Sequence, residues 1–164
     1  MKFIFEHVKR EEADEVLALY RSLVGTPFCA WTADYPSRSD VDFDLSRNAL
    51  FCLRNEENGE IAGVISIDED PKVENLSCWT KELQPSRELS RLGVCESYQN
   101  QGIARKLMAG AIEELRRQGF KSVHILVAKE NKKALASYRV FEYVTVGECF
   151  LHEHDYWCYE KALK

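Results

Sequence analysis

Two side chains of this sequence have the chemistry of proton transfer. Glu88 lies at the start of a predicted strand, and Tyr138 lies in a predicted short helix that follows the next strand. A positioned carboxylate can accept a proton from a reacting group, and a phenol can donate one to a leaving group. Each residue also has an ordinary structural interpretation: a solvent-exposed glutamate at a strand end, and a core tyrosine on an amphipathic helix.

The segment from Gln99 to Ala104 (QNQGIA) joins a predicted strand to a predicted helix and could bind an anion. The unpaired N–H groups and partial positive charge of a helix N-terminus suit a phosphate or pyrophosphate. Gly102 would let the backbone approach such a ligand without a Cβ atom. The segment matches neither the GxGxxG nor the GxxxxGK[ST] pattern, so an ordinary loop with a glycine at a helix start is the alternative.

A cationic ligand is suggested by residues 28–47, which combine the aromatic residues Phe28, Trp31 and Tyr35 with four aspartates, Asp34 among them. Aromatic rings and carboxylates attract cations through cation–π and Coulomb interactions. The segment could therefore bind an amine. A partly buried loop with a solvated acidic edge is the alternative.

The spacing of potential ligands does not predict a metal site. None of the six cysteines forms a CxxC or CxC pair, and His152-Glu153-His154 is an incomplete ligand set. We expect that tripeptide to form a polar turn between the last two strands. The cysteines are expected to be reduced thiols in a cytoplasmic protein.

Composition limits the class of protein further. The 164 residues are 45% hydrophobic and carry a formal net charge of −5, which fits a single globular domain over residues 1–164 without a basic footprint for nucleic acid. No apolar run approaches the roughly 18 residues of a membrane span. The N-terminus has no long apolar region and reaches an acidic residue at Glu6, so we expect neither a membrane partner nor a signal peptide.

Hydrophobic periodicity predicts a mixed α/β or α+β sheet protein. The expected strands cover residues 2–8, 49–54, 60–68, 88–94, 122–128, 143–147 and 155–162, and the expected helices cover residues 11–24, 39–47, 103–118 and 131–141. Asn58-Gly59 predicts a type I′ hairpin turn, and residues 70–86 read as a polar loop. Strict alternation would place Glu88, Ser90, Leu92 and Val94 on one face of their strand.

Two motifs resemble those of the GNAT superfamily of N-acetyltransferases. The run from Val94 to Ala104 matches V-x-x-x-[Y/F]-Q-N-Q-G-[I/L]-[A/G], and its core [Q/R]-x-x-G-x-[G/A] is present as Gln99, Gly102 and Ala104. Residues 131–143 resemble N-x-x-A-x-x-x-Y-x-x-x-[G/E]-[F/Y]. The resemblance covers about residues 49–145. Cys95 and Glu142 depart from the commonest residues at their positions and leave room for a specialised member.

The resemblance implies a mostly antiparallel sheet of six to seven strands, flanked by about four helices, whose fourth and fifth strands splay apart to admit acetyl-CoA. It implies that backbone groups of Leu92 and Val94 pair with the pantetheine arm and that Asn131 reaches the pantetheine or phosphate region. The pyrophosphate would be held by the amides of Gln99, Asn100, Gln101, Gly102, Ile103 and Ala104. Tyr138 would protonate the leaving thiolate, and several family members have a glutamate base at the position of Glu88.

These observations together predict an acetyl-CoA-dependent N-acetyltransferase that acts by direct transfer on a primary amine of a small molecule, without a metal. Trp31, Asp34 and Tyr35 would bind the amine. Transfer of a longer acyl group, or to a protein lysine or N-terminus, remains an alternative. A non-catalytic acyl-CoA-binding regulatory module is a second one. The apolar run from Tyr156 to Tyr159 would allow a homodimer.

Overall fold

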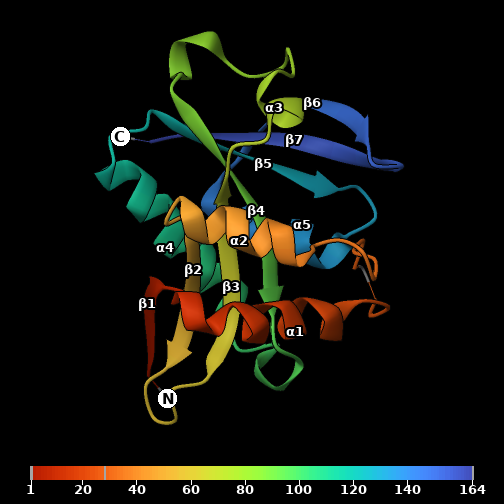
Figure 1. Ribbon diagram of the computed structural model, residues 1–164. Helices are drawn as coiled ribbons and strands as arrows, with labels where there is room; N and C mark the ends of the chain where they lie inside the picture. Colours follow the sequence, from red (N-terminus) through yellow and green to blue (C-terminus); the bar gives the residue numbers. More distant parts are fainter. Residues whose placement is uncertain (1, 28, 164) are drawn as a thin grey trace.

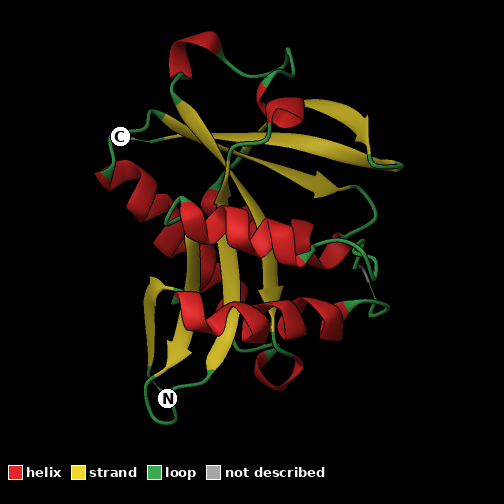
Figure 2. Cartoon of the chain, viewed as in Figure 1, coloured by secondary structure: helices red, strands yellow, loops and turns green. Residues whose placement is uncertain are grey.

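Seven strands form one mixed sheet with the order β1-β2-β3-β4-β5-β7-β6 (Figures 1 and 2). The computed structural model describes residues 2–27 and 29–163, so Phe28 lies outside it. All neighbouring strands are antiparallel except β4 and β5. The strands are β1 (Phe3–His7), β2 (Leu50–Asn55), β3 (Ile61–Asp68), β4 (Ser86–Val94), β5 (Ser122–Ala128), β6 (Val144–Leu151) and β7 (His154–Ala162).

Helices cover both faces of this sheet (Figure 2). One face packs against α4, whose apolar stripe joins the larger core cluster, and the other packs against α1 and α2. The helices are α1 (Ala13–Leu23), α2 (Arg38–Ser46), α3 (Pro71–Glu74), α4 (Ile103–Arg117) and α5 (Lys132–Tyr138), with short 3-10 turns at Arg10–Glu12, Lys81–Leu83, Glu96–Tyr98 and Arg139–Phe141. The expected fold class is confirmed.

The sheet opens between β4 and β5. These strands pair only where Ser86–Glu88 of β4 lies beside Ser122–His124 of β5. Beyond that point β4 continues along β3 to Val94, while β5 continues along β7, and Figure 1 shows the two strands diverging. The expected splay of the fourth and fifth strands is therefore present.

Because of a β-bulge in β4, the side chains of this strand do not all point to the faces of the sheet that the sequence predicted. Ser90 pairs with Ser66 and Gly93 pairs with Val64, so Arg91 and Leu92 together oppose one residue of β3. Arg91 takes the left-handed conformation, with φ of 46°. Because a bulge adds one residue, it reverses the alternation beyond it.

Glu88 and Ser90 therefore lie beside Asp68 and Ser66 on the α2 side of the sheet. Leu92 and Val94, in contrast, pack into the core on the α4 side. The prediction that all four β4 residues share a face is wrong for this reason.

Other boundaries differ locally from the predictions. The predicted polar loop after β3 contains α3, because Asp70 caps that turn by accepting a hydrogen bond from the Lys72 N–H. The hairpin between β2 and β3 is present, but only Gly59 has a positive φ, so it is not a type I′ turn. The expected turn between β6 and β7 is present, with positive φ at His152 and Glu153. All six cysteines are free, and no helix of the described residues is long and apolar enough to cross a membrane.

Candidate active site

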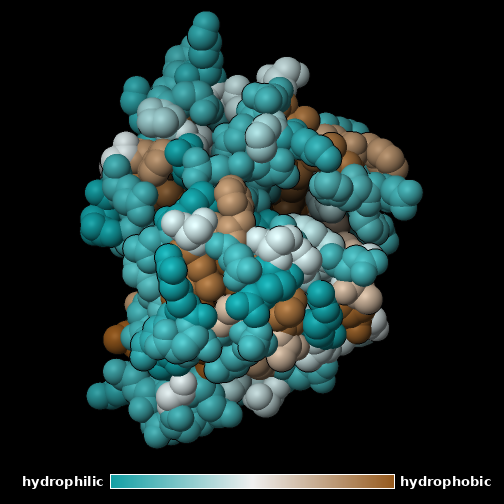
Figure 3. Space-filling view, viewed as in Figure 1, coloured by the Kyte–Doolittle hydropathy of each residue, from teal (hydrophilic) through white to brown (hydrophobic). Residues whose placement is uncertain are grey.

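A cavity of about 1090 Å³ opens where β4 and β5 diverge. Its walls come from these two strands, the first turn of α4, α5, the loop after α1 and the β6–β7 turn. Figure 3 shows hydrophobic side chains recessed in a hollow between the β6–β7 layer and the helices below it. The divergence of the strands thus creates a site at the centre of the molecule.

Most of the residues singled out in the sequence line this cavity. On its wall are Glu88, Leu92, Val94, Gln99, Asn100, Gly102, Ile103, Ala104, Asn131 and Tyr138, together with Trp31 and Tyr35. Gln101 and Asp34 are exposed and are not part of the wall. The structure therefore brings the proposed acid, the proposed base and most of the proposed ligand contacts to one place.

The loop before α4 has the geometry of an anion cradle. Gly102 is the N-cap of α4 with φ of 76°, and Asn100 has φ of 62°. The Lys106 N–H donates to the Gly102 carbonyl at 3.1 Å. In the described part of the chain, the N–H groups of residues 100–105 donate no hydrogen bond to protein. A Cβ built on Gly102 would have no atom within 4 Å, so the space before these donors is open.

This loop fits the pyrophosphate of a coenzyme A thioester. The first turn of α4 contains no acidic residue, and Arg105 follows on the cavity wall. Free N–H groups at a helix N-terminus and a nearby cation are the donors that a pyrophosphate requires. The Asn131 side chain, in contrast, caps α5 by accepting a hydrogen bond from the Ala134 N–H at 3.0 Å. Its amide nitrogen and the second lone pair of its oxygen are left for a ligand.

Tyr138 lies at the C-terminal end of α5 with 9% of its surface exposed. Burial raises the pKa of its phenol above the ordinary value of 10.0. No hydrogen bond to its hydroxyl is found among the described residues. The phenol is therefore protonated at neutral pH and has a proton to donate.

Glu88 is 5% exposed, and its Oε1 atom has no hydrogen-bond partner in the described chain. Burial raises the pKa of its carboxyl well above 4.5, and the carboxylates of Asp68, Asp70 and Glu74 raise it further against the opposing effect of Arg91. A carboxyl whose pKa lies closer to neutrality is a stronger base than an ordinary glutamate. Its position in the cavity is that of a group able to remove a proton.

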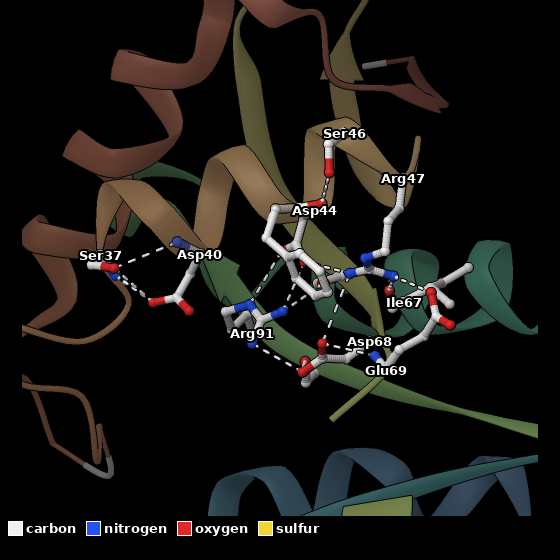
Figure 4. Close-up of polar contacts among 12 residues, drawn as sticks. Ser37, Asp40, Asp44, Ser46, Arg47, Ile67, Asp68, Glu69 and Arg91 are labelled. Carbon is white, nitrogen blue, oxygen red and sulfur yellow. Dashed lines mark hydrogen bonds and ion pairs between the residues drawn. The ribbon is translucent and has the colours of Figure 1, made fainter. Parts of the chain in front are cut away.

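Sequence reasoning missed Arg91, the bulged residue of β4. Its guanidinium donates to both Asp44 oxygens at 3.2 and 2.8 Å, to Asp68 at 3.0 Å, to the Ser66 hydroxyl at 3.1 Å and to the Tyr35 hydroxyl at 3.1 Å. Figure 4 shows Arg91 together with the two carboxylates that it bridges. The network joins α2, β3 and the bulge to the Tyr35 side of the cavity.

The carboxylates of this network respond differently to burial. For Asp68, burial alone would raise the pKa, but the ion pair with Arg91 outweighs it and lowers the pKa below 3.8. For Asp44, which is fully buried, burial dominates over Arg91 and raises the pKa. Asp44, Asp68 and Arg91 are far apart in the sequence, so no local sequence pattern predicts this network.

Comparison with known proteins agrees with this geometry. Residues 16–143 match the model of the acetyltransferase (GNAT) family. No curated protein sequence matches the chain.

Solved structures share the fold at low sequence identity. An N-acetyltransferase from Staphylococcus aureus Mu50 has a TM-score of 0.76 at 18% identity, with 100% of each chain covered. The structure of yncA from Salmonella typhimurium with its cofactor acetyl-CoA has a TM-score of 0.75 at 14% identity, covering 100% of this chain and 95% of that one. The ribosomal-protein-S18-alanine N-acetyltransferase from Escherichia coli has a TM-score of 0.75 at 15% identity, covering 99% and 95%.

The family match spans well over half of the chain and includes the anion cradle, Glu88 and Tyr138. The solved structures share the fold over nearly the whole length of both chains. The chain therefore belongs to the GNAT family and is an N-acetyltransferase of the kind that takes its acetyl group from acetyl-CoA.

Proposed function

We propose that this enzyme transfers an acetyl group directly from acetyl-CoA to a primary amine of a small molecule, with Glu88 as general base and Tyr138 as general acid. The single observation that carries the proposal is the state of Glu88. A buried carboxyl without a hydrogen-bond partner in the described chain, and with a raised pKa, lines the same cavity as the Tyr138 hydroxyl. Such perturbed groups in a cleft are typical of catalytic sites.

Several chain segments would hold acetyl-CoA. The N–H groups of residues 100–105 would bind the pyrophosphate, and the β4 backbone near Leu92 and Val94, free of β5, would pair with the pantetheine arm. When bound, acetyl-CoA supplies an acetyl thioester whose carbonyl carbon reacts with an amine. The amide donors and the helix dipole offset the charge of the phosphates.

Glu88 acts on the acceptor side of the reaction. An amine must lose its extra proton before its nitrogen lone pair can attack a carbonyl, and the Glu88 carboxylate accepts that proton. Because burial and three neighbouring carboxylates raise the pKa of Glu88, its affinity for the proton is greater than that of an exposed glutamate.

Tyr138 acts on the leaving side. The departing thiolate needs a proton, and the phenol of Tyr138 holds one throughout the neutral pH range because burial disfavours the phenolate. The lack of a competing hydrogen bond to the Tyr138 hydroxyl among the described residues supports this role.

The wall opposite the anion cradle suits a cationic acceptor. Trp31 and Tyr35 contribute aromatic surface, and Asp70, which accepts from the Lys72 N–H at 3.0 Å, adds a carboxylate that pairs with no cation among the described residues. A protonated amine would be attracted by these groups before Glu88 removes its proton. Asp34, which lies outside the cavity wall, would attract such an amine only from a distance.

A panel of amines tests the proposed function. Free amino acids, polyamines, aminoglycosides and peptides are offered with acetyl-CoA, and thiol release is measured. With the amine that the panel yields, we expect Glu88→Gln to lower kcat by about 10²–10⁴-fold, the usual contribution of a general base. The dissociation constant of acetyl-CoA should not change.

The pH dependence sharpens the same test. Because the base must be ionised, activity of the wild type should fall as pH decreases through the raised pKa of Glu88, and this acidic limb should disappear in Glu88→Gln. The control is Glu113→Gln, an exposed residue of α4. Wild-type activity in a folded Glu88→Gln protein would contradict the proposed base, and activity on peptides alone would contradict the small-molecule acceptor.

A further inference from the structure

Three buried polar atoms near Glu88 lack a hydrogen bond in the described chain. They are Glu88 Oε1, His124 Nε2 and Glu74 Oε1. A buried polar atom without a partner destabilises the folded protein, so three in one region call for an explanation in terms of function or bound water. None of the three is needed to hold the cofactor cradle, which lies at the other end of the cavity wall.

His124 connects the other two groups. It is the register partner of Glu88 at the last paired position of β4 and β5, so both side chains project from the same face. Its ring is 1% exposed and lies against Trp79, with ring centroids 4.5 Å apart. Its Nε2 atom lies 3.3 Å from Glu74 Oε1, within reach although not aligned as a hydrogen bond.

Glu74 leads from this buried ring to the surface. It ends α3, and its side chain is 27% exposed although its Oε1 atom is buried. A carboxylate at the boundary with solvent can exchange protons with water, whereas Glu88 faces the cavity that the reactants fill and the His124 ring is enclosed. The three residues therefore form a sequence of ionisable groups from the cavity to the outside.

The hydrogen bond between Ser86 and His124 determines which ring nitrogen of His124 could receive a proton. Ser86 Oγ lies 2.7 Å from His124 Nδ1. A carboxylate accepts hydrogen bonds only, so Glu74 favours the tautomer that has its proton on Nε2. The Nδ1 atom is then the acceptor of the Ser86 hydroxyl proton. In this state the ring can gain a proton at Nδ1 while it loses one from Nε2.

We propose that Ser86, His124 and Glu74 conduct to solvent the proton that Glu88 takes from the acceptor amine. The inference rests on the proposed role of Glu88 as the base. A buried base must lose its proton before the next turnover, and Glu74 is the member of these contacts whose side chain reaches solvent.

The transfer balances atom by atom. Protonated Glu88 gives its proton to a water molecule, which bridges the distance of about 7 Å between alternate residues of a strand. That water passes a proton to Ser86 Oγ, Ser86 passes its own to His124 Nδ1, and the Nε2 proton moves to Glu74. Each O–H or N–H bond that breaks is replaced by one that forms, and Glu74 releases one proton to solvent. The ring is left neutral with its proton on Nδ1, so it turns about its Cβ–Cγ bond to restore the starting tautomer before the next turnover.

Rapid-quench kinetics of Glu74→Gln and His124→Gln test the proposal, with saturating acetyl-CoA and the amine from the panel. Glu88 can still take up one proton in each variant, so we expect one acetylated product per active site at the wild-type rate. The steady-state kcat that follows should fall at least about tenfold, with the KM for the amine unchanged. Imidazole added as a small proton carrier should restore the steady state of Glu74→Gln.

The matched control is Glu82→Gln, since Glu82 is exposed in the same segment between β3 and β4. It should show neither the burst nor the fall in kcat. A merely structural role for Glu74 would give no burst and no rescue by imidazole, and this result would overturn the proposal.

Two further outcomes would also overturn the proposed proton path through Ser86, His124 and Glu74. Wild-type kcat in the folded Glu74→Gln protein would overturn it, as would a raised KM for the amine with kcat unchanged, which would mean that Glu74 binds the acceptor. If His124→Gln does not fold, Glu74→Gln decides alone, because the Glu74 side chain is partly exposed and the substitution keeps its shape. If Glu88 is not the base, the Glu88→Gln protein will keep wild-type activity, and this result distinguishes that case from failure of the proposed proton path.

Discussion

The two ends of the cavity are built in different ways. At the proposed cofactor end, consecutive residues from Asn100 to Arg105 present backbone N–H groups, held in place by one glycine and the start of α4. The expected use of the Gln99 N–H is not available, because that group donates to the Glu96 carbonyl at 3.2 Å. At the acceptor end, the groups are side chains brought together from the loop after α1, the end of β3, β4 and the β6–β7 turn. One end is local in sequence and the other is assembled by the fold.

This difference separates two kinds of specificity. A backbone cradle depends on chain conformation and tolerates many side chains, so it suits a cofactor whose phosphates are always the same. The acceptor end depends on which charges and rings the fold places side by side, so it can be changed residue by residue. Substitutions at the cofactor end should therefore alter binding of acetyl-CoA, and those at the acceptor end should alter catalysis and the choice of amine.

The largest effect is expected from Tyr138, where the two ends meet. Tyr138→Phe keeps the ring and its packing and removes only the hydroxyl. General acid catalysis contributes about 10²–10⁴-fold, so kcat should fall by that factor while the dissociation constant of acetyl-CoA changes little. Steady-state kinetics and calorimetric binding measure the two quantities. Full activity in Tyr138→Phe would return this residue to a purely structural role.

The next largest effect should come from Arg91, which holds the acceptor end together. Arg91→Leu removes the cation that bridges Asp44 and Asp68 and leaves them only Arg47, at 2.8 and 3.8 Å. Removing one partner of a buried ion pair typically destabilises by about 3–5 kcal/mol. Urea denaturation measures this loss. Arg38→Leu is the matched control, because Arg38 pairs with Asp14 and Asp42 on the surface and should contribute less than about 1 kcal/mol. Equal losses in both variants would contradict the structural role of the network.

The cofactor end was predictable from sequence because it is encoded locally. The QNQGIA run, the start of α4 at Ile103 and the strand from Ser122 to Ala128 all lie where the sequence predicted them. Each depends on a short pattern: a glycine at a helix start, an apolar face of helical period, or a continuous apolar strand.

The acceptor end was predictable only in part. The alternation of β4 contains no sign of the extra residue, because the bulge is stabilised by Asp44 and Asp68 from distant segments. The aspartates on the cavity wall are Asp68 and Asp70, and Asp34 beside the aromatic residues is not part of the wall. Two of the carboxylates that raise the pKa of Glu88, Asp70 and Glu74, belong to the cap and the end of α3, a segment that the sequence presented as a polar loop.

A smaller effect, confined to the cofactor end, is expected from Gly102. Gly102→Glu would place a negative side chain in the open space before the free N–H groups, so the dissociation constant of acetyl-CoA should rise at least about tenfold, or 1.4 kcal/mol. Gly102→Ala is the matched control, since both variants carry the strain of a positive φ while alanine adds little volume and no charge. Unchanged binding in a folded Gly102→Glu protein would contradict the cradle.

The smallest effect that we expect is a change with pH in the free energy of unfolding, caused by the ionisation of buried Glu88. The pKa of Glu88 is raised in the folded protein, mainly by burial, so its contribution to stability is full below the ordinary pKa of 4.5 and is lost as pH rises through the folded value. Glu88→Gln cannot ionise and avoids this loss. The free energy of unfolding of the variant, relative to the wild type, should therefore increase from acidic to mildly alkaline pH. Because the constant cost of a buried amide cancels in this comparison, urea denaturation of both proteins across that pH range isolates the carboxylate, and a difference that does not change with pH would show that Glu88 is not held in a raised-pKa environment.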